Sequence, residues 1–272
     1  MDQPTMFEPR SVAADTESLS SYLPVPGFGV LPINAFLIRA TQPVLIDTGI
    51  AALRNEFLQN LRSLITPEEL RWIWITHADV DHVGSLEAVL ALAPHARVVT
   101  TFVGMAKMSL QQLPTDRVYL LNPGQSLDIG DRQLLAVRPP TFDAPETTGL
   151  FDTRTRVLFS ADSFGALMAK PVENAADLAP ADLRDGQTTW ATIDAPWLQF
   201  VDEQKFAANV NRVGQLEPSV VLSAHLPPAR DMTQTLCQNL IAARQAPAFE
   251  GPDQAALERM MAVASGPGAQ VA

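Results

Sequence analysis

The sequence contains a single cysteine, Cys237, among its 272 residues. One cysteine excludes an intramolecular disulfide and a metal site built from several thiolates, so Cys237 is expected to be a small buried filler. Basic residues are also scarce, because 19 Lys and Arg face 30 Asp and Glu, and no run of four basic residues occurs. The net charge of -11 therefore argues against nucleic-acid and anionic-membrane partners, which need clustered positive charge.

Long apolar runs and a secretory leader are absent from the sequence as well. No window approaches the roughly 18 uninterrupted apolar residues of a membrane helix. Acidic residues stand near the N-terminus, where a secretory signal needs positive charge. We therefore expect a soluble cytoplasmic protein. Its 47% hydrophobic content is enough for one sizeable core, and we expect a single domain over residues 1–272 with its core at about 28–230.

Four ionisable side chains crowd together directly after the apolar run 72–75, in the segment Thr76-His77-Ala78-Asp79-Val80-Asp81-His82. An extended backbone would place His77, Asp79 and Asp81 on one side, roughly 6.5 Å apart from one to the next. The loop could instead cap a helix over 85–92, but one cap needs only one acceptor. Four crowded ionisable groups need a compensating cation, and imidazole with carboxylate suits Fe, Mn or Zn.

The patterning along the chain predicts alternating strands and helices that form a sheet covered by helices. After a polar leader, the expected elements are a hairpin of strands 28–38 and 43–46, helices 51–64, 85–92 and 103–113, and strands 72–76 and 97–101. Short strands from residue 117 onward predict a second sheet, and helices are expected within 232–264. Residues 171–196 show no clear period, which is typical of a surface excursion or of a lid over the site.

Three further candidate ligands follow apolar strands or the turns between them: Asp143, Asp162 and His225. Each has an ordinary explanation when taken alone, the two carboxylates as turn or helix caps and the imidazole as a loop histidine. Their common position at strand ends, which the first cluster shares, instead predicts one site assembled from several loops.

The motif His77-x-Asp79-x-Asp81-His82, with Asp47-Thr48-Gly49 before it and Asp162 and Ala224-His225 after it, resembles the ligand series of the metallo-β-lactamase superfamily. The resemblance covers about residues 28–230. It implies an αββα sandwich, two mixed sheets covered by helices, with a dinuclear metal site at one edge of the sheets. It also implies that Asp162 bridges the ions, that Asp47 orients a histidine, and that the remaining ligands divide into His77, Asp79 and Asp143 on one ion and Asp81, His82 and His225 on the other.

One of two departures from the commonest superfamily pattern indicates a branch. Asp79 and Asp143 stand where histidines are usual, and a carboxylate at the first of these positions, together with the segment 158–165, resembles the flavodiiron and oxygen-binding diiron branch. Four carboxylates would balance the charge of two divalent ions. Such an oxygen-rich shell favours Fe, with Mn or Zn as the alternatives.

The branch resemblance implies a diiron protein that binds or reduces O2 or NO. Flavodiiron enzymes carry a flavodoxin domain after the metal domain, and the 47 residues that follow His225 are too few for one. We therefore expect a standalone sensor or a protein with a separate electron donor, and the resemblance also implies a homodimer. The alternatives are a hydrolase of an ester, lactone or phosphoester that uses a metal-bridging hydroxide, and a non-catalytic protein with a vestigial site.

Overall fold

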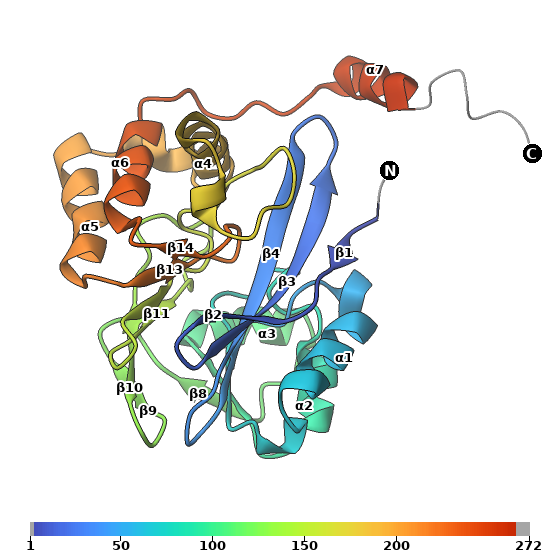
Figure 1. Cartoon of the computed structure of the whole chain (residues 1–272), viewed down its shortest axis with the longest axis vertical. Helices are drawn as coiled ribbons and strands as arrows, with labels where there is room; N and C mark the ends of the chain where they lie inside the picture. The colour runs from blue at the N-terminus through green and yellow to red at the C-terminus, as the bar shows by residue number, and fades with distance from the viewer. Residues whose placement is uncertain (1–2, 265–272) are drawn as a thin grey trace, which may run out of the picture.

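Two β-sheets lie face to face in the computed structural model, and helices cover their outer faces (Figure 1). The structure describes residues 3–264, with side chains through Met260. One apolar layer fills the space between the sheets, and a further layer lies beneath the helices on each outer face. This arrangement confirms the predicted αββα sandwich with two mixed sheets.

The first sheet contains a strand that the sequence analysis took for part of a polar leader. Its strands are β1 (Thr5–Met6), β2 (Arg10–Ala13), β3 (Thr16–Val25), β4 (Gly29–Ile38), β5 (Val44–Ile46), β6 (Trp72–Trp74), β7 (Arg97–Thr100) and β8 (Val118–Leu120). The missed β3 pairs with β4 along ten residues. Its serines and threonine hide the apolar alternation, so only the pairing with β4 reveals it as a strand. The predicted hairpin of β4 and β5 is confirmed.

The helices on the first sheet agree with the apolar spacing of the sequence. They are the short η1 (Ala51–Leu53), α1 (Arg54–Leu64), the short η2 (Pro67–Glu69), α2 (Leu86–Leu92) and α3 (Phe102–Leu110). Phe57 and Leu61 of α1 pack with the buried face of β6 through Ile73. The order β5-β6-β7-β8 is parallel, so the carboxyl ends of these strands lie at one edge of the sheet.

The second sheet has the strand order β14-β13-β12-β11-β10-β9. These strands are β9 (Ser126–Asp128), β10 (Gln133–Val137), β11 (Gly149–Asp152), β12 (Val157–Phe159), β13 (Val220–Leu222) and β14 (Ala229–Arg230). One expectation was wrong, because β8 pairs with β7 and belongs to the first sheet. Strands β12 and β13 are parallel, so the loops after them leave from the same edge.

Residues 171–196 are not an irregular excursion. They contain η3 (Ala175–Asp177) and most of them form the regular helix α4 (Pro180–Asp194), whose Leu183 and Ala191 pack into the core. The sequence shows no clear period here because buried polar side chains, among them Gln187, interrupt the apolar stripe of α4. Whether this segment controls access to the site stays a prediction.

The remaining helices complete the outer layer of the second sheet and continue beyond it. They are η4 (Pro196–Phe200), α5 (Glu203–Gln215), α6 (Thr233–Ala243) and α7 (Gln254–Ala264). Figure 1 shows α4, α5 and α6 grouped on one side of the molecule and α7 above the β3-β4 hairpin. Cys237 is buried on α6 as expected, and burial raises the pKa of its thiol to about 11. Within residues 3–264, no helix has both the length and the apolar character to cross a membrane.

Candidate metal centre

The loop that follows β6 carries four of the predicted ligands and is tied to the loop that follows β5. The backbone N–H and the hydroxyl of Thr48 both donate to the His82 carbonyl, at 2.7 and 2.8 Å. Gly84 donates to the Gly49 carbonyl at 2.9 Å, and a side chain at Gly84 would place its first carbon 2.3 Å from the Ala51 nitrogen. The close approach of the two loops therefore requires glycine at position 84.

This loop is not extended over its whole length, which corrects the predicted spacing of its side chains. The carbonyl of Asp79 accepts hydrogen bonds from the backbone N–H groups of His82 and Val83, so the chain turns after Asp79. The turn sends Asp81 away from His77 and Asp79. As a result, the four ionisable residues of the motif divide into two pairs rather than forming one row.

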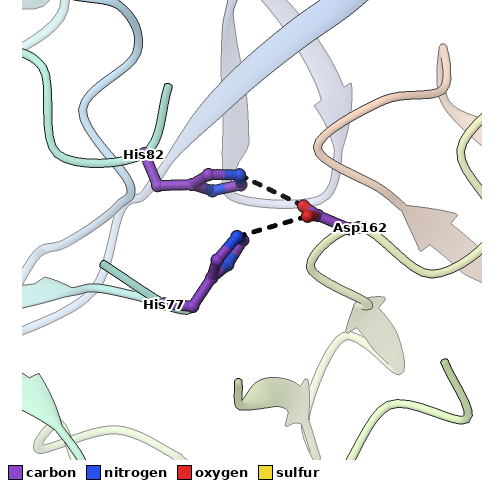
Figure 2. Close-up of side chains that lie close together, drawn as sticks. All are labelled: His77, His82 and Asp162. Carbon is purple, nitrogen blue, oxygen red and sulfur yellow. Dashed lines mark ion pairs between the residues drawn. The ribbon is translucent and has the colours of Figure 1, made fainter. Parts of the chain in front are cut away.

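The carboxylate of Asp162 faces two histidines of the motif, as Figure 2 shows. Its Oδ2 lies 3.2 Å from His77 Nε2, and its Oδ1 lies 3.1 Å from His82 Nε2. The rings of the two histidines are 3.9 Å apart between centroids. All three side chains are buried, although they come from loops that follow strands of different sheets. One carboxylate is thus shared by two imidazoles.

A third histidine, His225, reaches the same carboxylate from the loop after β13. Its Nε2 lies 3.3 Å from Asp162 Oδ1 and 3.4 Å from Asp81 Oδ2. Its Nδ1 lies 2.8 Å from the Pro32 carbonyl, which fixes Nδ1 as the donor and leaves Nε2 free to accept or ligate. Asn34 holds the loop itself, because its side-chain amide donates to the carbonyls on both sides of His225, at residues 223 and 226.

The contact between Asp47 and His82 has the form that a supporting carboxylate for a metal ligand takes. Asp47 Oδ2 lies 2.9 Å from His82 Nδ1 and accepts the Thr76 hydroxyl at 2.8 Å. Its Oδ1 accepts the backbone N–H of Thr76 at 2.9 Å. Asp47 has φ of 56°, a strained conformation for a residue other than glycine. The strain is consistent with a carboxylate held in place to orient an imidazole.

The structure brings all seven predicted ligands together in linked groups. One group contains His77, Asp79 and Asp143, a second contains Asp81, His82 and His225, and a third joins the first two through His77, His82 and Asp162; within each group the candidate ligand atoms lie within 4.8 Å of one another. The fourth histidine of the chain, His95, is exposed. The groups therefore have the composition of two neighbouring metal positions that share one carboxylate.

The loop that carries Asp143 is held by two basic side chains. Arg138 donates to the carbonyls of Pro145 and Thr147, at 2.8 and 2.6 Å. The buried carboxylate of Glu146 lies 2.7 Å from the ammonium group of Lys107 on α3. Asp143 itself is exposed, unlike the other members of the centre that lie deeper, so it stands at the open side of the site.

An eighth candidate ligand, an aspartate that the sequence analysis did not select, lies at the centre. Asp194 is the last residue of α4 and is 5% exposed. It forms a further group with Asp143 and Asp162, in which the carboxylate oxygens again lie within 4.8 Å of one another. It follows no strand and belongs to no motif. Its only sequence signal is an Asp directly before Ala195-Pro196, where a negative charge at a helix C-terminus is unfavourable.

The opposite charges within the cluster shift the pKa values of its members strongly. Burial would lower the pKa of His82, but the carboxylates of Asp81 and Asp162 outweigh it and raise this pKa well above the ordinary histidine value. Burial would likewise raise the pKa of Asp162, yet His77 and the other two histidines hold it well below the usual range. The carboxylates thus favour positive charge on the imidazoles, and a metal ion that supplied this charge would displace their protons.

The buried atoms of the centre fit a metal ion. Among the described residues, His77 Nε2, His82 Nε2 and Asp162 Oδ1 form no hydrogen bond of acceptable geometry, although the nitrogen–oxygen distances are short. Buried polar atoms without partners are rare and call for an explanation such as an ion. Imidazole nitrogens and carboxylate oxygens are competent ligands for Fe, Mn and Zn.

Known proteins with similar sequences share about half of this chain. A putative diflavin flavoprotein A 2 from Nostoc sp. is 33% identical over 135 residues, which are 48% of this chain and 23% of that protein. An anaerobic nitric oxide reductase flavorubredoxin from Salmonella typhi is 36% identical over 134 residues, 48% of this chain and 28% of that protein. The chain thus spans about a quarter of the length of these relatives.

Solved structures with the same fold cover most of the chain. The rubredoxin oxygen:oxidoreductase of Desulfovibrio gigas superposes with a TM-score of 0.74 at 18% identity, over 88% of this chain and 62% of that one. A flavoprotein from Thermotoga maritima gives a TM-score of 0.77 at 18% identity, over 90% of this chain and 62% of that one. At such identities these likenesses show the fold alone.

The family model described as "ODP family beta lactamase" matches residues 31–225, which include every predicted ligand. The match extends from β4 to the loop after β13 and so covers the parts of both sheets that carry the centre. Because the matched span is well over half of the chain, this protein belongs to the ODP family of beta-lactamase-fold proteins.

Proposed function

We propose that this protein holds two metal ions, iron in the first place and Mn or Zn as alternatives, and that its site binds or reduces O2 or NO. One observation carries the proposal: Asp162 lies within 3.3 Å of imidazole nitrogens of three histidines that come from two separate loops. A single carboxylate shared in this way is suited to bridge two ions.

The proposed ligands divide around that bridge. His77, Asp79 and Asp143 would hold the first ion, and Asp81, His82 and His225 would hold the second. The close groups in which these side chains lie support the division. The turn after Asp79 supports it as well, because it separates the two halves of the motif.

Bound iron would supply the electron-transfer chemistry that the protein's side chains lack. The role of the surrounding side chains is to orient the metal-binding imidazoles and to shield them from water. Asp47 fixes the ring of His82, and the Pro32 carbonyl fixes that of His225. Trp190 lies against His225 with ring centroids 4.4 Å apart and shields it from water. The four ligand carboxylates would balance the charge of two divalent ions. This negative charge would stabilise oxidation of the ions to the trivalent state, and it would weaken their Lewis acidity toward a neutral carbonyl group.

The similar proteins support a small diatomic substrate. Their names include a nitric oxide reductase and a rubredoxin oxygen:oxidoreductase, and the latter shares the fold over most of this chain. We propose a separate redox protein as the source of electrons, or a sensing role that needs no turnover.

The test is to load the protein anaerobically with Fe(II), determine the iron content by elemental analysis, and mix it with O2 or NO in a stopped-flow spectrometer. We expect two ions per chain and a rapid spectral change. His225→Ala should weaken both results, whereas the matched His95→Ala, which alters an exposed histidine outside the centre, should leave them unchanged. A silent spectrum together with robust turnover of a lactone or phosphodiester would move the assignment to a hydrolase.

A further inference from the structure

Helix α4 presents two side chains to the metal centre from one face. Trp190 lies against the ring of His225, tilted by 51°, and donates its indole N–H to the Asp162 backbone carbonyl at 3.0 Å. Asp194 comes four residues later, so it lies on the same side of the helix, one turn closer to the C-terminus. Gln187, one turn earlier, donates to the Phe164 carbonyl at 3.2 Å. The same face that docks α4 on the Asp162 loop therefore directs Asp194 toward the centre.

The docking is close enough to fix the position of Asp194. A side chain at Gly165 would place its first carbon 2.5 Å from Trp190 Nε1 and 2.8 Å from His225 Cβ. One at Gly186, on α4 itself, would lie 2.2 Å from the Leu167 carbonyl oxygen. Glycine at both positions therefore allows α4 to pack directly against the loop that follows Asp162. The position of Asp194 is thus fixed by a helix that packs into the core.

The surroundings of Asp194 are unfavourable for a carboxylate without a cation. Its Oδ2 is buried and has no hydrogen-bond partner among the described residues. The carboxylates of Asp143 and Asp162 lie beside it, and it ends a helix, where the peptide dipoles add negative potential. Burying such a group costs several kcal/mol unless it is paired. A buried residue at which several unfavourable features occur together, here a missing hydrogen-bond partner, neighbouring like charges and a position at a helix C-terminus, is typical of a functional position.

We propose that Asp194 is an additional oxygen ligand of the first metal position, an inference that rests on the proposed dinuclear function. The first position then has one nitrogen ligand, His77, and four carboxylates. The second has two histidines and two carboxylates, counting Asp162 for both. The first position is the harder of the two and prefers Fe or Mn, whereas the second accepts Zn more readily.

The test measures Mn²⁺ binding to the full-length chain without any assay of activity. Wild-type protein should bind two Mn²⁺ per chain. Asp194→Asn keeps the shape of the side chain but removes its charge, and should bind one Mn²⁺ at a concentration that saturates the wild type, with at least a tenfold loss of affinity at the weakened position. Asp185→Asn, on the exposed face of the same helix, should still bind two.

Two further measurements make the result decisive. Metal-free Asp194→Asn should melt no lower than the metal-free wild type, because the substitution removes one carboxylate from a crowded cluster. Asp194→Cys loaded with Co²⁺ should show a sulfur-to-cobalt charge-transfer band, which appears only when residue 194 reaches the ion. This second variant keeps the test valid even if the first one does not fold.

The outcomes separate the two proposals. Two Mn²⁺ bound with unchanged affinity in a folded Asp194→Asn, or a folded, Co²⁺-loaded Asp194→Cys without the charge-transfer band, would overturn the role of Asp194 and leave the dinuclear function standing. A wild-type chain that binds fewer than one ion would overturn both. Wild-type binding of two ions with silent O2 and NO chemistry would reject the redox function alone.

Discussion

Replacing Asp162 with alanine should remove about twice as much metal-dependent stability as replacing Asp143. Asp162 lies within 3.3 Å of three histidine nitrogens and serves both proposed positions, whereas Asp143 is a proposed ligand of the first position only. An ion at 100 times its dissociation constant stabilises the folded state by about 2.7 kcal/mol. Loss of one ion therefore costs about 2.7 kcal/mol, and loss of two about 5.4 kcal/mol.

These free energies correspond to separable shifts in the melting temperature. At about 2–4 °C per kcal/mol for a large domain, metal should raise the melting temperature of Asp143→Ala by roughly 5–10 °C less than that of the wild type, and of Asp162→Ala by roughly 10–20 °C less. Calorimetry of each variant with and without metal at fixed free concentration is the appropriate assay. The difference within one variant cancels any effect of the substitution on the metal-free fold.

Asp185→Ala serves as the control, because its side chain is exposed on α4 and it belongs to none of the groups of candidate ligands. It should retain the full metal-dependent shift. Equal shifts in Asp162→Ala and Asp143→Ala would refute the assignment of Asp162 as the shared ligand, and a full wild-type shift in Asp162→Ala would refute a metal position at this carboxylate.

Three other predictions test the support of the centre. Asp47→Ala should weaken metal binding by about 10- to 100-fold in a chelator competition, because His82 loses its orienting partner, and unchanged affinity would contradict that role. The metal-free protein should lose stability as the pH rises above about 6.5, the ordinary pKa of histidine. The pKa values of His82 and His225 are raised in the folded state, so these residues keep their protons there at a pH at which the unfolded chain has released them. A melting temperature that rises over this range in calorimetric scans would contradict this prediction. Gly165→Ala should destabilise the fold by about 1–3 kcal/mol in urea titrations, because the added carbon collides with Trp190, and a neutral effect would show that α4 can move away.

The expectations about the fold succeeded where one element carries its own pattern. The apolar run of β6 and the helical spacing of α1 gave correct elements because each buries one face against the core. The expectation for β3 failed, since its serines and threonine are compatible with a loop until the ten-residue pairing with β4 buries them. The expectation for α4 failed because Gln187 and other polar residues of this helix face inward. They make contacts such as the hydrogen bond from Gln187 to the Phe164 carbonyl, which no local sequence pattern predicts.

The sequence by itself predicted which side chains the candidate centre contains and their order along the chain. The motif from His77 to His82, followed by Asp162 and His225, places ligand types directly after strands, and parallel strands deliver their carboxyl ends to one edge. The spacing within the motif, however, was settled by the turn after Asp79, which depends on hydrogen bonds between backbone groups.

Only the tertiary structure decided that Asp194 belongs to the centre. In the sequence it is one of 30 acidic residues, and it follows no strand and no ligand motif. Its position results from the packing of α4, whose Trp190 contacts His225 and whose Gly186 meets the backbone after Asp162. Contacts between segments distant in the chain depend on the shape of the whole core, so the residues that they bring together leave no periodic or local signal.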